Sequence, residues 1–161
     1  FEFGHGYSLF TCLLRPHSRG SVKLHKAGET HQVLIDHNFL SDSRDEVHIV
    51  EAIKKARELL SSQEFDSVRG DEIAPGKSIQ SDEDLLEYIR HSALTVYHPV
   101  GTCKMGIDEL AVVSPSDLKV KGMRNLRVID ASIMPNIVSG NTSAPTMLIA
   151  EKGSRMILDK V

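Results

Sequence analysis

The sequence has 161 residues, of which 25% are charged and 40% hydrophobic, and its formal net charge is −3. This length can bury one real hydrophobic core, and the slightly acidic balance argues against nucleic acid as a partner. No apolar run approaches the roughly 18 residues that a membrane-spanning helix needs.

Alternating apolar residues near the N-terminus predict strands. Residues 7–15 are predicted to form one strand and residues 21–25 the returning strand of a hairpin-like pair. The segment between them, residues 16–20, contains Pro and Gly and is predicted to be the turn. Residues 32–36 are a candidate for a further strand.

Two amphipathic helices are predicted in the middle of the chain. The first has Ser41 or Asp42 as its N-cap and an apolar face at helical spacing that continues to about Leu60. A polar loop with Gly and Pro separates it from the second. The second helix starts at Ser81, where Ser81 and Asp84 have the spacing of a capping box.

The C-terminal third is expected to be rich in loops. Residues 97–115 form a dense loop region, and the short apolar run at residues 126–130 predicts a buried strand that ends in a carboxylate. After another loop, Pro145 opens the last helix, because a proline at the first helical position loses no hydrogen bond. This helix continues to about residue 158, with Gly153 as its weak point.

Together these elements predict an α+β fold. The hairpin at residues 7–25 should belong to a mostly antiparallel sheet. One face of that sheet should be covered by the helices near residues 42–60 and 81–90.

Cysteines and histidines give no sign of a metal site. The eight histidines include no HxxxH or HExxH pair on a plausible helix, and the sequence has no CxxC. Two cysteines in a chain of this size are no disulfide framework. Cys12 and Cys103 are therefore expected to be reduced, buried thiols.

Three segments carry the functional signal when they are taken together and in order. They are His98-Pro-Val-Gly-Thr-Cys-Lys-Met-Gly106, Asn125-Leu-Arg-Val-Ile-Asp-Ala-Ser-Ile-Met-Pro135, and Ser139-Gly-Asn-Thr-Ser-Ala-Pro-Thr-Met-Leu-Ile-Ala-Glu-Lys152. Taken singly, a histidine in such a loop is more often structural, and a polar run before a helix is usually a cap. The ordered combination closely resembles the C-terminal signature of glucose-methanol-choline oxidoreductases.

The resemblance extends upstream and implies two domains. Residues 15–24 look like that family's substrate-domain strand and turn, so the similarity spans nearly the whole chain. It implies a substrate-binding domain over residues 1–123. Residues 124–161 would then supply the closing strand, catalytic loop and helix of an FAD-binding domain.

The resemblance also implies roles for individual residues. His98, in the HPxGT motif, would be the base that faces the substrate hydroxyl, and Asn141 would be its polar partner across the substrate. An Asn at this position is similar to the choline dehydrogenase and bacterial alcohol dehydrogenase branches. The positions that match cofactor contacts, with FAD as the cofactor, are Tyr97, Asp130, Ala131, Thr142, Pro145 and Thr146.

The chemistry of such an enzyme needs these residue types. Oxidation of an alcohol moves a hydride from the carbinol carbon to flavin N5, while the hydroxyl proton leaves to a base such as histidine. An asparagine cannot titrate, but it can hydrogen-bond to the alkoxide-like oxygen. A helix N-terminus near Pro145 would favour the negative charge of the reduced flavin.

Two departures from the family pattern bear on the isolated chain. No GxGxxG follows a strand, so the fingerprint that holds the dinucleotide is not in this sequence. We therefore expect the 161 residues to be the C-terminal portion of the enzyme, to bind FAD weakly or not at all by themselves, and to self-associate through apolar surface. Ser114-Pro115 stands where the family commonly has Asp-Pro, which predicts a local change of turn.

The resemblance implies an FAD-dependent oxidoreductase that converts a primary alcohol, of choline or aliphatic type, to the aldehyde. Its electron acceptor would be oxygen or a quinone-like carrier, and its location cytoplasmic or peripheral to a membrane. Two alternatives stay open. One is a hydroxynitrile lyase of the same fold, which keeps the flavin without redox turnover, and the other is a truncated, non-catalytic binding module.

Overall fold

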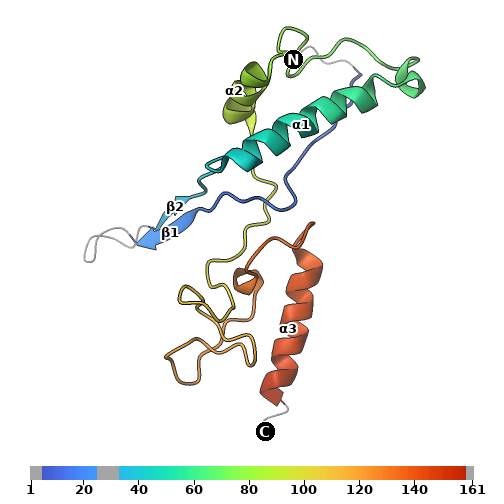
Figure 1. Cartoon of the computed structure of the whole chain (residues 1–161). Helices are drawn as coiled ribbons and strands as arrows, with labels where there is room; N and C mark the ends of the chain where they lie inside the picture. Colours follow the sequence, from blue (N-terminus) through green and yellow to red (C-terminus); the bar gives the residue numbers. More distant parts are fainter. Residues whose placement is uncertain (1–4, 25–32, 159–161) are drawn as a thin grey trace. The chain divides into compact units, whose positions relative to one another are not determined.

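The computed structural model describes residues 5–24 and 33–158, and Figure 1 shows its elements along the chain. The described residues divide into two compact units. The first unit comprises residues 5–13, 17–19 and 38–95, and the second comprises residues 14–16, 20–24, 33–37 and 96–158. The helices and the strand pair are of the kinds that the sequence predicts for an α+β fold.

The first unit is built on two helices, α1 (Ser43–Leu60) and α2 (Asp82–Ser92). Both begin at the predicted caps. Asp42 accepts the Arg44 N–H at 3.0 Å, and the Ser81 hydroxyl accepts the Asp84 N–H at 3.1 Å. A single turn of 3₁₀ helix, η1 (Gln63–Phe65), follows α1. The predicted start of each helix is therefore confirmed.

Apolar side chains of α1 and α2 form the core of this unit. Val50 of α1 packs with Leu85 and Ile89 of α2, and all three are buried. An ion pair between Arg90 Nη2 and Glu46 Oε1, 2.5 Å apart, also joins the two helices. Val50 and Ile53 of the predicted apolar face of α1 thus pack against α2, whereas Val47, predicted for the same face, is 61% exposed.

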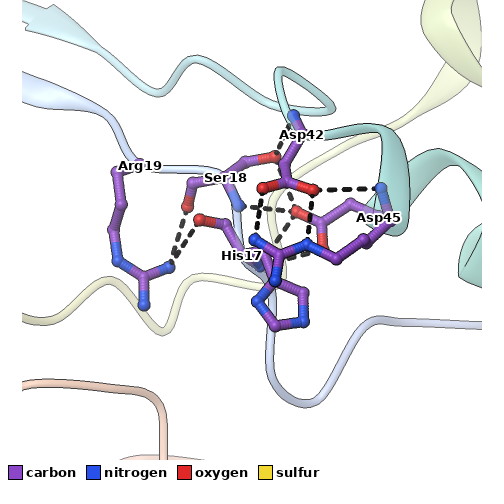
Figure 2. Close-up of polar contacts among 6 residues, drawn as sticks. His17, Ser18, Arg19, Asp42 and Asp45 are labelled. Carbon is purple, nitrogen blue, oxygen red and sulfur yellow. Dashed lines mark hydrogen bonds and ion pairs between the residues drawn. The ribbon is translucent and has the colours of Figure 1, made fainter.

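A carboxylate in the first turn of α1 holds the segment that was predicted to be a turn. Asp45 is buried and accepts the backbone N–H groups of His17 and Ser18, at 2.8 Å and 2.7 Å, together with the Ser18 hydroxyl at 2.6 Å (Figure 2). Ser18 Oγ also accepts the Asp42 N–H at 3.2 Å. Residues 17 and 18 are therefore fastened to the start of α1.

In the second unit the strands β1 (Ser21–Leu24) and β2 (Val33–Asp36) form an antiparallel pair. Val22 lies opposite Ile35 in this register. The backbone before β1 comes so close to β2 that a Cβ on Gly20 would lie 2.2 Å from the Asp36 carbonyl oxygen. Val22, Leu24 and all four residues of β2 are exposed.

The prediction that residues 7–15 form the first strand of a hairpin is wrong. These residues have no regular secondary structure, and Phe10 within them is 93% exposed. Alternation alone does not make a strand, which needs a partner for its backbone groups. Residues 21–24 take that partner from the strand at 33–36, which was itself predicted; His25 and Gln32, the ends of the predicted strands, lie outside the described residues.

Loops and one long helix make up the rest of the second unit. α3 (Ser143–Leu158) packs near a 3₁₀ turn, η2 (Ala131–Ile133), and the core consists of Val113, Leu118 and Ile133. α3 begins two residues before Pro145, so that proline is its third residue rather than its first. The helix is close-packed at Gly153, where a Cβ would lie 2.4 Å from Ile129 Cγ2.

The predicted strand at residues 126–130 is also wrong. Only Arg127 takes part in a β-bridge, with Lys119. The remaining bonds are those of an irregular loop pair: Val120 N–H donates to the Leu126 carbonyl at 3.0 Å, and Val128 N–H donates to the Leu118 carbonyl at 3.3 Å. Leu118 has a positive φ of 57°, which interrupts regular pairing beside this segment.

The two cysteines are free thiols, but neither is buried as predicted. Cys12 is exposed and Cys103 is half-buried. Among the described residues, no helix combines the length and the apolar character that crossing a bilayer requires.

Candidate active site

The loop that carries His98 is shaped by two residues with positive φ. Tyr97, immediately before it, has φ of 64°, and Gly101, three residues after it, has φ of 92°. The Gly101 backbone passes close to the Met134 carbonyl oxygen, which a Cβ would approach to 3.4 Å. Left-handed backbone at both positions turns the chain sharply on either side of the histidine.

Backbone hydrogen bonds tie this loop to the η2 segment. Cys103 N–H donates to the Ser132 carbonyl at 3.1 Å, and Met105 N–H donates to the Ile133 carbonyl at 2.8 Å. η2 itself is capped by Asp130, whose Oδ1 accepts the Ser132 N–H at 2.8 Å. The first and second motifs of the sequence therefore lie side by side through main-chain contacts.

The imidazole of His98 is held by the residue that precedes α3. His98 Nδ1 lies 3.0 Å from Thr142 Oγ1, and the Thr142 N–H donates to the same nitrogen at 3.4 Å. His98 is half-buried and Thr142 is 8% exposed. The first and third motifs, separated by 44 residues, thus meet at one ring nitrogen.

Thr142 is in turn fixed by the first turn of α3. Its carbonyl oxygen accepts both the N–H of Thr146, at 3.0 Å, and the Thr146 hydroxyl, at 2.6 Å. Asn141, directly before Thr142, is exposed and has no hydrogen-bonded partner among the described residues. The Asn141 amide could therefore hydrogen-bond to another molecule, and it is next in the chain to the threonine that contacts His98.

Of the sequence-predicted site residues, the structure brings His98 and Thr142 into direct contact and places Asn141 next to them in the chain. Asp130 and Ala131 lie in the η2 segment beside the His98 loop. Pro145 and Thr146 lie in the first turn of α3. Tyr97, directly before His98 in the chain, is 80% exposed.

One contact at this site was missed by sequence reasoning. Arg15 Nε donates to Ser139 Oγ at 2.5 Å, which ties the segment before β1 to the loop that carries Asn141. Ser139 has a positive φ of 66°, so the loop bends sharply there. Arg15 could be singled out from the sequence because it begins the upstream motif. Its partner could not be predicted, because Ser139 is 124 residues away in the chain.

The arrangement can move a proton. The imidazole is half-buried and held at Nδ1, an imidazole can accept or release a proton at its other ring nitrogen, and a neutral amide stands nearby in the chain. In the described part of the chain, no three His, Cys, Asp or Glu side chains come close enough together to hold a metal ion.

Comparison with protein families matches residues 16–150 to the family described as GMC oxidoreductase. The chain is 46% identical over 158 residues to an alcohol dehydrogenase [acceptor] of Pseudomonas putida, and the match covers 98% of this chain and 28% of that protein. It is 44% identical over 148 residues to an oxygen-dependent choline dehydrogenase of Proteus mirabilis (strain HI4320), with 92% and 26% covered. The chain therefore spans little more than a quarter of the length of these relatives.

Solved structures of oxidoreductases are also similar to this chain. Pyridoxine 4-oxidase from Mesorbium loti matches with a TM-score of 0.81 and 36% identity, covering 88% of this chain and 28% of that one. A fungal aryl-alcohol oxidase matches with a TM-score of 0.82 and 36% identity, covering 92% and 24%. Both the sequence relatives and the structural neighbours are thus oxidoreductases much longer than this chain.

Proposed function

Because this chain belongs to the GMC oxidoreductase family, we propose that it is the C-terminal portion of an FAD-dependent enzyme that oxidises a primary alcohol to the aldehyde. The observation that carries the proposal is the His98 ring, whose Nδ1 is held by Thr142 at the start of α3 while Asn141 stands beside that threonine in the chain. The ring that could accept a proton is thus in contact with the residue that follows a neutral polar side chain, which supports the proposal.

His98 is the proposed general base. Oxidation of an alcohol requires that the hydroxyl proton leave as the carbonyl forms, and an imidazole takes up a proton near neutral pH. The Asn141 amide is the proposed partner, because it can donate a hydrogen bond to the oxygen from which the proton leaves. The choline or aliphatic type of alcohol is proposed from the names of the relatives.

The start of α3 offers backbone donors that would suit an anionic part of a bound FAD. The Thr142 N–H faces His98, Pro145 has no N–H, and the Thr146 N–H is bonded to the Thr142 carbonyl. Ser143 and Ala144, which are exposed, therefore carry the backbone donors that this helix N-terminus offers to an anionic group. FAD, when bound, would supply the acceptor for the hydride that leaves the carbinol carbon.

The proposal also includes the other predicted cofactor positions. Asp130 already caps η2 through Oδ1, so that its contribution to the cofactor would come through its other oxygen. Ala131 and Tyr97 are proposed as contacts by their place in the motifs. A formate oxidase from Aspergillus oryzae RIB40, described for a mutation that affects FAD modification, is similar to this chain with a TM-score of 0.80 and 29% identity.

The proposal also assigns the residues to two domains. Residues 1–123 would belong to a substrate-binding domain and residues 124–161 to the FAD-binding domain. The exposed β1–β2 pair would be part of a larger, mostly antiparallel sheet covered by helices. The electron acceptor would be oxygen or a quinone-like carrier, and the enzyme would be cytoplasmic or peripheral to a membrane.

The proposal is tested on the full-length protein loaded with FAD. A panel of primary alcohols, choline included, is mixed with it under anaerobic conditions, and bleaching of the flavin absorbance is followed. At least one alcohol should reduce the flavin, and the aldehyde should appear with it. A flavin that stays oxidised with every alcohol would instead favour the non-redox alternative, which cleavage of a cyanohydrin would then identify.

A further inference from the structure

The hydroxyl and the backbone N–H of Thr142 both contact Nδ1 of His98, and the two groups differ in whether they can accept a hydrogen bond. A backbone N–H can only donate, so the Thr142 N–H at 3.4 Å favours an Nδ1 that carries no proton. The hydroxyl at 3.0 Å can donate or accept. In the neutral ring both contacts are satisfied together when Oγ1 donates and the ring proton is on Nε2.

A base for an alcohol needs the opposite arrangement. Nε2 can accept the hydroxyl proton only when the ring proton is on Nδ1, and that Nδ1–H then needs an acceptor. The Thr142 N–H cannot serve, but Oγ1 can, by turning its own proton away. The hydroxyl is therefore the one described partner of Nδ1 that suits both tautomers.

We propose that Thr142 is a positioning residue for His98, and that its hydroxyl is the reversible partner of Nδ1 that allows Nε2 to act as the base. This rests on the proposed function. In the step itself the O–H bond of the alcohol breaks, an N–H bond forms at Nε2, and Nδ1 keeps its proton and donates it to Thr142 Oγ1. The two neutral tautomers exchange beforehand through solvent water.

The surroundings of Thr142 support this role. The residue is 8% exposed, its carbonyl oxygen accepts two hydrogen bonds from Thr146, and its hydroxyl lies 3.0 Å from His98 Nδ1. A threonine that merely capped α3 would direct its side chain at the N–H groups of the helix. The Thr142 hydroxyl instead contacts the His98 ring.

The first test reads the ring itself in the 161-residue chain, at about pH 8.5, where histidine side chains are neutral. Long-range ¹H–¹⁵N spectra report whether Nδ1 accepts hydrogen bonds. T142V removes the hydroxyl and keeps the shape, and its His98 Nδ1 signal should move toward that of a nitrogen without a donor. T142S should keep the wild-type signal, as should T102V, the same change on an exposed threonine of the His98 loop.

The second test follows flavin reduction in the full-length, FAD-loaded protein. T142V should slow reduction by roughly 10- to 100-fold, the loss typical when a partner that orients a histidine is removed. T142S should recover most of it, with KM for the alcohol changed little. An unchanged Nδ1 signal in T142V, or a loss in T142V that T142S does not recover, would overturn the positioning role. A wild-type reduction rate in the His98→Ala variant would instead overturn the proposed base, even with the Nδ1 contact intact.

Discussion

The Asp45 carboxylate accepts the Ser18 hydroxyl at 2.6 Å and the Ser18 backbone N–H at 2.7 Å, both on Oδ2, although the two residues are 27 positions apart. Figure 2 shows these bonds at the first turn of α1. Asp45 is only 1% exposed, and its carboxylate is the acceptor in each of its hydrogen bonds with residues 17 and 18. This buried acid therefore holds the segment before β1 in place.

Replacement of Asp45 by Asn should destabilise the chain. An amide oxygen can accept part of the bonds, but the amide N–H₂ group would face backbone donors. Leaving buried donors unpaired costs about 1–3 kcal/mol, which we expect as the loss in free energy of unfolding by urea. Asp71→Asn is the matched control, because Asp71 is exposed and pairs with exposed Lys77; it should change stability by less than about 1 kcal/mol. Equal losses in both variants would contradict the anchoring role.

The same carboxylate should make stability depend on pH. Burial by itself would raise the pKa of Asp45, but the hydrogen bonds from His17 and Ser18 outweigh it and hold the pKa below its usual value of 3.8. A lowered folded pKa means that the stabilisation is complete above pH 3.8 and is lost as the pH falls through the folded value. Urea unfolding at stepped pH should therefore show the gap between wild type and D45N closing only in this acidic range. A gap that closes near neutral pH would count against it.

Gly153 should not tolerate even a methyl group. A Cβ there would meet Ile129 Cγ2 at 2.4 Å, and a crowded core typically loses 1–3 kcal/mol. Alanine gains roughly 1 kcal/mol in helix propensity, so the net loss for Gly153→Ala should be up to about 2 kcal/mol by thermal or urea unfolding. Lys152→Ala, at an exposed neighbour, should be nearly neutral. In an Ile129→Ala background the cost of Gly153→Ala should shrink, and a cost that stays the same would exclude this contact as its cause.

His98 and Asn141 should differ in how much they contribute to flavin reduction in the full-length protein. His98→Ala removes the proposed proton acceptor, so stopped-flow reduction by the best alcohol should fall by roughly 10²–10⁴-fold. Asn141→Ala removes one positioned donor and should cost less, about 10–10³-fold. Circular dichroism and retained FAD show whether each variant is folded. Unchanged reduction in a folded His98→Ala protein would leave the proposed mechanism without its base.

The 161-residue chain by itself should bind FAD weakly or not at all. Its sequence contains no Gly-rich turn for the pyrophosphate, and the donors at the start of α3 are proposed to serve a different part of the cofactor. Gel filtration after incubation with FAD should give colourless protein, with an elution volume that depends on concentration because apolar side chains such as Leu24 and Ile35 are exposed. A yellow peak with one FAD per chain would contradict the expectation.

Local chemistry made the helices predictable. The caps at Asp42 and Ser81 and the apolar spacing of α1 and α2 involve residues within four positions of one another, so the sequence contains the whole signal. The family, too, could be recognised, because the three motifs occur in order in one chain. The alternation at residues 7–15 and the apolar run at residues 126–130 led to wrong strand predictions. A strand also needs a partner strand, which cannot be identified from the local sequence pattern.

Only the tertiary structure decided which side chains meet. An acid in the first turn of a helix is favourable anywhere, but the path of the chain brings residues 17 and 18 to Asp45. Thr142 was predicted to be a cofactor contact, and the structure shows its hydroxyl on His98, 44 residues earlier. Gly153 looked like a weakness of the last helix, yet its missing side chain makes room for Ile129. Short-range bonds and periodicity can be read along the chain, whereas contacts between distant residues follow from packing in three dimensions.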